Sequence, residues 1–348
     1  MKFYFLISSS RLGGAQSYTK NYSLLISKYY SSQIIYGTNE SSIFNEIPEI
    51  PCLLFKGLNI PFNLLVLIKL YKYFKNKKDS ILIISSFAAG VNVRLVGMVL
   101  GIKTIYVSHG WSYQYKKKII KNFAFILEYI FSKYSYTLCI SKSDLDIAIN
   151  RLKIPKKNIL FIRNRYLIFN KDIKSSFLSK KPKNILFVGR NEYPKRLDLF
   201  IELSKKFIEY NFFIVGVEEN ELAKLLPGKN VYFLGKIQNF NNYEKYDLFC
   251  LFSNSEGLPL SGIEAGANGL PLMLSNVGGC SELIFNGNGV LVNNNIINIE
   301  KAFKYIISNF NSFSESSFKI KNKFILESDN NILLQRSLRL LKYKLSIK

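Results

Sequence analysis

Histidine, cysteine and acidic residues are scarce in this chain. Among its 348 residues there are one histidine, four cysteines and 24 acids, against 48 lysines and arginines. The cysteines lie in or near apolar runs, and no C-x-x-C pair occurs. This scarcity argues against a structural zinc site and against a disulfide framework, and it favours a reducing cytosol.

Long hydrophobic runs are also missing. Lysine interrupts each apolar stretch within about ten residues, so none reaches the roughly 18–20 residues that span a bilayer. The first run, FYFLIS at 3–8, is shorter than the core of a signal peptide and leads into a glycine turn. We therefore expect a soluble protein that can still contact membranes.

The formal net charge is +24. Such an excess favours anionic partners, among them phosphorylated small molecules and acidic lipid surfaces. The abundance of Lys, Ile, Asn, Phe and Tyr together is also what codon bias in an A/T-rich genome produces, and both interpretations stay open for the total charge. The chain has no RNA- or DNA-binding motif, so we expect no nucleic-acid partner.

Short, mostly continuous apolar runs recur along the chain, as is typical of strands buried on both faces of a parallel sheet. They cover 3–8, 81–86, 104–108, 136–141, 185–189, 212–216, 231–235, 247–253 and 270–275. Segments of helical length and pattern, such as 61–74 and 195–210, lie between them. Strand and helix in alternation predict a doubly wound α/β architecture with right-handed crossovers.

The strand–turn–helix pattern begins again after a polar, basic stretch at 170–184. We expect a Rossmann-like domain over 1–168, a linker over 169–183 and a second Rossmann-like domain over 184–328. The last segment, 329–348, is expected to be a helix that packs back toward the first domain. Ligands of open α/β sheets bind at the carboxyl ends of the strands, so the loops there are the places to search, with a cleft between the two sheets.

Three of these loops carry candidate residues. Gly13 and Gly14 precede a helix whose N-terminus favours an anion, or else form a plain tight turn. Arg190 and Lys195 follow the first strand of the second domain and suit a diphosphate, or are two solvated cations. The single histidine, His109, follows a strand and is expected at its carboxyl end, in either a structural or a catalytic role.

The stretch SNSEGLPLSGIEAGANGLP at 253–271 holds two acids and no base. Glu256 is expected in a strand-to-helix loop and Glu264 on the helix that follows, which begins near Pro259. The N–H groups of Gly257 and Leu258 are expected to face an anion. Because no basic residue is near in sequence, we expect both carboxylates to pair with the hydroxyls of a ligand, and the ligand that fits is a nucleotide-sugar.

These residues resemble the E-x7-E pattern of retaining GT-B glycosyltransferases of the large family four. The flanking LPL, EA, GLP and VGG strengthen the resemblance. Further elements follow in the family's order: GGA at 13–15, VSHG at 107–110, CISKSDL at 139–145, IRN at 162–164, ILFVGR…K at 185–195, VYFLG at 231–235 and YEKYD at 243–247. The match spans nearly the whole chain.

The resemblance implies an α/β GT-B fold of two Rossmann-like domains with mostly parallel sheets facing a central cleft, the nucleotide-sugar held mainly by the C-terminal one. It implies catalytic roles for four residues. His109 would lie beside the transferred sugar, and Glu256 would contact hydroxyls of the donor sugar. Arg190 and Lys195 would neutralise the leaving diphosphate. It implies that Glu264 binds the nucleotide ribose. Gly13, Gly14, Gly257, Leu258 and Pro259 complete the expected donor site, with no metal and no cofactor.

The expected activity is metal-independent transfer of a sugar, with retention, to a glycan or lipid-diphosphate-linked acceptor in O-antigen, capsule or other surface polysaccharide synthesis. The alternatives are a GT-B epimerase, an inverting transferase, or a non-catalytic basic nucleotide-sugar-binding paralogue. The basic, aromatic segments 111–121 and 69–78 indicate an anionic membrane surface as a further partner, or else a solvated helix face. The expected location is the cytoplasm, peripheral on the inner face of the plasma membrane.

Two glycines depart from the usual pattern. Gly262 and Gly266 stand where bulkier residues are common, and Gly costs up to about 1 kcal/mol within a helix. They are expected to loosen the helix or to make room for a larger donor sugar. Arg196 follows Lys195 where glycine is common, a variant also seen in the family.

Overall fold

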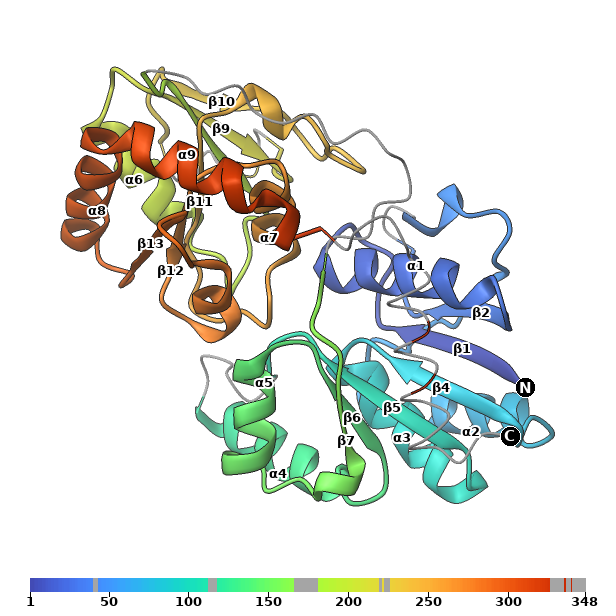
Figure 1. Ribbon diagram of the computed structural model, residues 1–348. Helices are drawn as coiled ribbons and strands as arrows, with labels where there is room; N and C mark the ends of the chain where they lie inside the picture. The colour runs from blue at the N-terminus through green and yellow to red at the C-terminus, as the bar shows by residue number, and fades with distance from the viewer. Residues whose placement is uncertain are drawn as a thin grey trace. The chain divides into compact units, whose positions relative to one another are not determined.

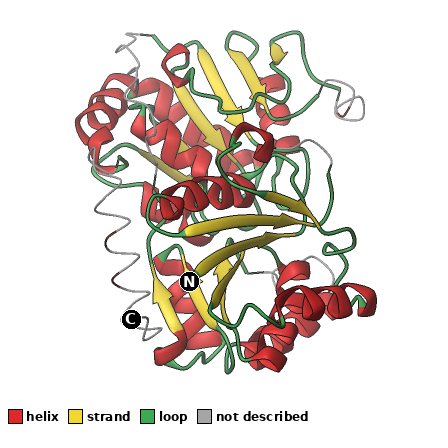
Figure 2. Cartoon of the chain, turned by 90° about the vertical axis from the view of Figure 1, so that its right-hand side faces the viewer, coloured by secondary structure: helices red, strands yellow, loops and turns green. Residues whose placement is uncertain are grey.

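The computed structural model describes residues 1–39, 43–111, 118–165, 181–218, 221, 226–325, 335 and 339. Within them the chain forms two compact units that part between Arg163 and Asn164. Most of the expected linker at 169–183 and the expected helix at 329–348 lie outside the described residues, and both stay predictions. Each unit is an α/β sandwich in which helices cover a sheet (Figures 1 and 2).

The first unit contains a sheet whose paired strands are all parallel. Its order is β3 (Cys52–Leu54), β2 (Ser31–Tyr36), β1 (Lys2–Ile7), β4 (Ser80–Ile84), β5 (Lys103–Ser108), β6 (Tyr136–Cys139) and β7 (Ile159–Phe161). The helices are α1 (Gly14–Ser27), α2 (Leu64–Phe74), α3 (Phe87–Leu100), α4 (Lys118–Phe131) and α5 (Lys142–Asp146). The strands are buried along almost their whole length, as continuous apolar runs predict.

The second unit repeats this plan with its own parallel sheet. Its order is β10 (Val231–Phe233), β9 (Asn211–Val215), β8 (Asn184–Val188), β11 (Leu248–Leu251), β12 (Leu272–Ser275) and β13 (Gly289–Val292). The helices are α6 (Leu197–Lys206), α7 (Leu260–Ala267), α8 (Ile296–Ser308) and α9 (Phe310–Ile320). The predicted doubly wound α/β architecture is confirmed in both units.

The core of the second unit is rich in aromatic side chains. Phe200 of α6 and Phe303 of α8 both pack on Phe212 of β9, with ring centroids 5.3 and 6.2 Å apart. All three rings are fully buried. Aromatic pairs contribute about 0.5–1.5 kcal/mol each beyond their buried area. This packing holds the helices against the sheet and fixes the loops at its carboxyl edge.

Candidate active site

Two neighbouring strands, β8 and β11, form the topological switch point of the second sheet. From β8 the chain continues to β9 and β10 on one side, and from β11 it continues to β12 and β13 on the other. Ligands of open α/β sheets bind beyond the carboxyl ends of such a strand pair. The loop after β8 carries Arg190 and Lys195, and the loop after β11 carries Glu256.

Backbone contacts join these two loops. Lys195 and Ser253 form an isolated antiparallel bridge. The N–H of Arg196 donates to the carbonyl of Phe252 at 2.9 Å, and the N–H of Asn254 donates to the carbonyl of Pro194 at 2.8 Å. The side chain of Lys195 is therefore held beside the start of the glutamate loop.

Lys195 and Glu256 form an ion pair. Nζ of the lysine lies 2.6 Å from Oε1 of the glutamate, and Oγ of Ser253 donates to the same oxygen at 2.5 Å. The side chains are 19% and 11% exposed, so the pair is mostly shielded from water yet still reachable. The expectation that Glu256 has no basic partner is wrong, because the lysine comes from a loop 61 residues earlier in the chain.

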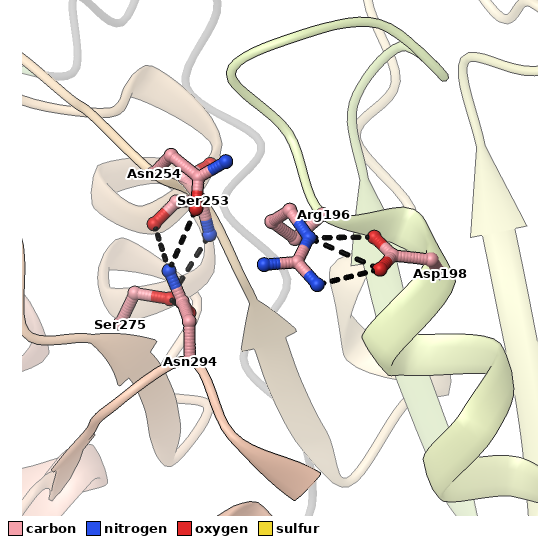
Figure 3. Close-up of polar contacts among 6 residues, drawn as sticks. All are labelled: Arg196, Asp198, Ser253, Asn254, Ser275 and Asn294. Atoms are coloured by element: carbon pink, nitrogen blue, oxygen red, sulfur yellow. Dashed lines mark hydrogen bonds and ion pairs between the residues drawn. The ribbon is translucent and has the colours of Figure 1, made fainter. Parts of the chain in front are cut away.

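A polar network behind this pair ties together the ends of three strands (Figure 3). Oγ of Ser275 accepts from the N–H of Ser253 at 2.9 Å and donates to Oδ1 of Asn294 at 2.5 Å. Nδ2 of Asn294 donates to the carbonyl of Ser253 at 2.7 Å and to Oδ1 of Asn254 at 3.3 Å. Sequence reasoning missed Ser253, Ser275 and Asn294. Ser275 is the last residue of β12, and Ser253 and Asn294 each lie two residues beyond the ends of β11 and β13.

The structure shows why the middle residue of the VGG stretch, Gly278, has to be glycine. Its φ is +49°, and a Cβ there would lie 1.8 Å from the carbonyl oxygen of Glu256. The next residue, Gly279, donates its N–H to the carbonyl of Gly257 at 2.8 Å. Gly278 therefore brings this turn against the glutamate loop more closely than any side chain permits.

The loop reaches α7 through Leu258 and Pro259. Leu258 is buried, and its carbonyl accepts from Nδ2 of Asn164 at 3.3 Å. Pro259 is the residue before the first helical position, and the helix spans Leu260–Ala267, which confirms the expected start near Pro259. The anion-binding role of the Gly257 and Leu258 N–H groups stays a prediction.

Glu264, on the same helix, has a phenol as its partner. The OH of Tyr243 donates to Oε2 of Glu264 at 2.7 Å, and the tyrosine is buried. Burial raises the pKa of the Glu264 carboxyl, and the hydrogen bond from Tyr243 opposes this shift. The second carboxylate oxygen keeps its capacity for a donor such as a ribose hydroxyl.

The two unusual glycines of this helix make room for the protein's own side chains. A Cβ at Gly262 would lie 2.9 Å from Cδ1 of Leu283, and one at Gly266 would lie 2.6 Å from the ring of Phe324. The interpretation that they open space for a larger sugar is wrong, because Leu283 and Phe324 occupy that space. Their cost in helix propensity is offset by closer packing.

Arg190 has a different environment from Lys195. Its Nη1 lies 3.7 Å from Oε2 of Glu192, and the side chains are 40% and 45% exposed. Arg196, next to the lysine, makes a bidentate pair with Asp198 in the first turn of α6, with Nη2 2.7 Å from Oδ2 (Figure 3). The contribution of Arg190 to a diphosphate site stays a prediction.

His109 belongs to the first unit, where it follows β5. Its ring packs edge-on against Tyr18 of α1, with centroids 4.8 Å apart, and Tyr18 stacks on Tyr22. Burial lowers the pKa of His109 to about 4, so the imidazole is neutral at neutral pH. Nε2 of His109 is buried and has no hydrogen-bond partner among the described residues.

The same helix begins at the glycine loop. Gly13 precedes α1 and Gly14 is its first residue. A Cβ at Gly14 would meet nothing within 4 Å, so no neighbouring atom demands glycine there. Through Tyr18, the structure brings this helix against His109, and the tyrosine is a contact that sequence reasoning missed. The roles of His109, Gly13 and Gly14 stay predictions.

The part of the chain that the structure describes contains no group of three or more His, Cys, Asp or Glu side chains placed to hold a metal ion. Among the same residues, no helix combines the length and the apolar character needed to cross a membrane. The basic segment at 111–121 falls largely outside the described ranges.

Several known proteins resemble this chain in sequence. Residues 169–321 match the family model of glycosyl transferases group 1. The chain is 36% identical to the O-antigen biosynthesis glycosyltransferase WbnH of Escherichia coli, over 93% of this chain and 95% of that protein. It is 29% identical to the UDP-Gal:alpha-D-GlcNAc-diphosphoundecaprenol alpha-1,3-galactosyltransferase of E. coli, over 75% of this chain and 71% of that protein.

Solved structures support the fold. The crystal structure of Anabaena HepE in complex with UDP-glucose aligns with a TM-score of 0.77 at 17% identity, over 99% of this chain and 100% of that one. A likeness at this identity shows the two-domain GT-B fold. Together with the identity to WbnH over nearly the full length of both chains, it shows that this chain belongs to the group 1 glycosyltransferases.

Proposed function

We propose that this protein transfers a sugar from a nucleotide-sugar donor, with retention of anomeric configuration, to a lipid-diphosphate-linked glycan in surface polysaccharide synthesis. Two E. coli relatives support this class of donor and acceptor: an O-antigen biosynthesis glycosyltransferase and a galactosyltransferase that acts on a diphosphoundecaprenol-linked sugar. The observation that carries the proposal is the ion pair of Lys195 with Glu256 at the switch point of the second sheet.

The pair provides one site for an anion and one for hydroxyl groups. A donor diphosphate offers Lys195 a stronger anionic partner than a single carboxylate, so binding replaces the internal pair. Glu256 is then free to accept hydrogen bonds from hydroxyls of the donor sugar. As the bond to the diphosphate breaks, charge grows on the leaving oxygen and the lysine ammonium stabilises it.

Glu264 extends the site toward the nucleoside. Its Oε2 is engaged by Tyr243, and its second oxygen is assigned to a ribose hydroxyl. The N–H groups of Gly257 and Leu258, together with Pro259, are assigned to the diphosphate side of the same loop. Arg190, Gly13 and Gly14 are proposed to complete phosphate binding, and His109 is proposed to contact the transferred sugar as a neutral imidazole.

The proposal includes transfer without a metal ion, because the lysine and the loop N–H groups can supply the positive charge that a metal otherwise provides. Full turnover in excess EDTA supports this part. Loss of activity in EDTA, restored by Mg²⁺ or Mn²⁺, contradicts it. A peripheral position on the inner face of the cytoplasmic membrane, where a lipid-linked acceptor would be reached, belongs to the same proposal.

A nucleotide-sugar screen tests the function. Any ligand that binds the native state raises the melting temperature, so each UDP-, GDP- and other nucleotide-sugar is scored by thermal shift. The best donor is then incubated with a lipid-diphosphate-linked sugar, and the product is analysed by NMR. An α-product from an α-donor supports retention, and a β-product assigns an inverting transferase. An epimerised donor without transfer assigns an epimerase, and binding without turnover assigns a non-catalytic paralogue.

A further inference from the structure

Three helices of the first unit form one layer. α2 connects β3 to β4, α3 connects β4 to β5 and α4 connects β5 to β6, all in the same direction across the sheet. Right-handed crossovers therefore place all three helices on one face of the sheet. The N–H of Asn63, before α2, donates to Oδ1 of Asn92 on α3 at 3.2 Å, and Arg94 of α3 pairs with Glu128 of α4 at 2.8 Å.

The outward surface of this layer is apolar. Large apolar side chains between 44% and 84% exposed follow helical spacing on α2 and α4. They are Leu64, Leu65 and Ile68 on α2, and Ile119, Phe123, Ile126 and Ile130 on α4. The ring of Phe62, just before α2, lies 6.1 Å from that of Phe123, which joins the two groups over α3. We call these residues the outer apolar surface.

The core does not account for this surface. α4 already buries a separate face through Ala124, Leu127 and Phe131. A helix that is apolar on two sides, only one of which packs into the described core, indicates a second apolar environment.

The charges around the surface have one sign. Lys69, Lys72 and Lys75 on or next to α2, and Lys121 on α4, are all exposed. Between Leu64 and Phe74, and between Lys118 and Phe131, the only acid is Glu128. Its carboxylate is buried and held by both terminal nitrogens of Arg94, at 2.8 and 3.0 Å. The exposed faces of the two helices therefore offer positive charge beside apolar side chains.

We propose that the outer apolar surface binds an anionic lipid bilayer, with the isoleucine, leucine and phenylalanine side chains at the boundary of headgroups and acyl chains. The flanking lysines contact the headgroups, as they do in helices that lie in the plane of a membrane. The peripheral location given under the proposed function thereby acquires a defined surface. Because Ile126 and Ile130 lie outside the donor site, this proposal and the transferase activity can fail separately.

Vesicle sedimentation of the full chain tests this surface. The wild type is expected to bind vesicles that contain phosphatidylglycerol more tightly than vesicles of phosphatidylcholine alone. Added salt should weaken binding only in part, because screening removes the lysine contribution and leaves the apolar one. The double variant Ile126→Ser/Ile130→Ser should lose about tenfold or more in the vesicle partition coefficient, since two apolar side chains no longer insert.

A matched variant controls for general surface hydrophobicity. Ile208 and Ile297 are also highly exposed but lie in the second unit, so Ile208→Ser/Ile297→Ser should leave the partition coefficient unchanged. Equal binding by both double variants, or no binding by the wild type, overturns the proposal. A wild-type dimer in light scattering that only Ile126→Ser/Ile130→Ser converts to monomer also overturns it, because a second copy then covers the surface. Donor turnover without vesicles, measured in parallel, reports separately on the transferase.

Discussion

At the scale of single residues, the Lys195–Glu256 pair is the feature on which the site depends. The residues near Glu256 in the sequence include no base, and its ion-pair partner, Lys195, comes from a distant loop. A partly shielded pair of this kind exchanges partners when a stronger anion arrives. In the proposed mechanism, a nucleoside diphosphate and Glu256 compete for the single ammonium group of Lys195.

Glu256→Gln is predicted to separate binding from turnover. The variant removes the carboxylate that competes for Lys195, so the affinity for free nucleoside diphosphate should rise up to about tenfold, the scale of one modest ion pair. Turnover should fall about 10²–10³-fold, because contacts to donor hydroxyls are lost. Calorimetric titration and steady-state kinetics measure the two effects. Glu300→Gln, which breaks the surface pair with Lys206, is the control, and a fall in diphosphate affinity for Glu256→Gln alone contradicts the exchange.

Tyr243→Phe is predicted to change the pH dependence of donor binding. The hydrogen bond from Tyr243 lowers the pKa of Glu264 against the effect of burial, so its loss raises that pKa further. As pH falls, Glu264 of the variant should become protonated at a higher pH than in the wild type. The acid limb of 1/KM for the donor should therefore move to higher pH. At saturating donor, kcat should change little. A profile with the wild-type midpoint would show that Tyr243 does not act through Glu264.

His109 is predicted to make the fold sensitive to acid. Its pKa is about 4 in the folded chain and about 6.5 when unfolded, so the unfolded state binds more protons between these values. Stability should therefore decline as pH falls from about 6.5 to 4, by at most about 3 kcal/mol. Urea unfolding at several pH values measures this slope, and His109→Asn should flatten it. An unchanged slope would place the acid sensitivity on other groups.

At the scale of elements, the loop that carries Glu256 is shaped by packing that single residues do not reveal. Gly278 touches its backbone, and Ser275 and Asn294 hold the strand end from which it departs. The sequence predicts most of the strands and the approximate bounds of α2, α6 and α7. It misses β2, β3, β7 and β13, and the run SSQIIY of β2 begins with polar residues rather than apolar ones. The ion pair and the network were not predictable, since their members lie on loops far apart in the chain.

Gly278→Ala is predicted to lower activity and to destabilise the fold more than Gly101→Ala does. Both Gly278 and Gly101 have positive φ, so alanine at either site should cost about 1 kcal/mol of backbone strain. Only at Gly278 would the added Cβ meet the carbonyl of Glu256, whereas Gly101 faces open space. Turnover should therefore fall at least about tenfold for Gly278→Ala and stay normal for Gly101→Ala. Equal turnover in the two variants would show that the loop adapts without moving Glu256.

At the scale of the whole molecule, two sheets of the same plan carry different candidate surfaces. The second unit holds the switch-point pair, with Glu264 on the helix that follows, and the first unit holds His109 and the outer apolar surface. The restart of the strand–helix pattern predicted this duplication. The outer apolar surface was not predictable from the basic segments 69–78 and 111–121 alone. Its apolar residues become visible only when burial distinguishes the inner from the outer face of α2 and α4.

The most direct measurement is donor turnover by Lys195→Ala beside Lys206→Ala, followed as release of nucleoside diphosphate with the best donor of the screen. Both lysines are in ion pairs with glutamate in the second unit, at 2.6 and 2.7 Å. Loss of the leaving-group charge partner should lower turnover about 10²–10³-fold for Lys195→Ala, and Lys206→Ala should retain wild-type turnover. Equal turnover in the two variants would contradict the assignment of the Lys195–Glu256 pair as the catalytic site.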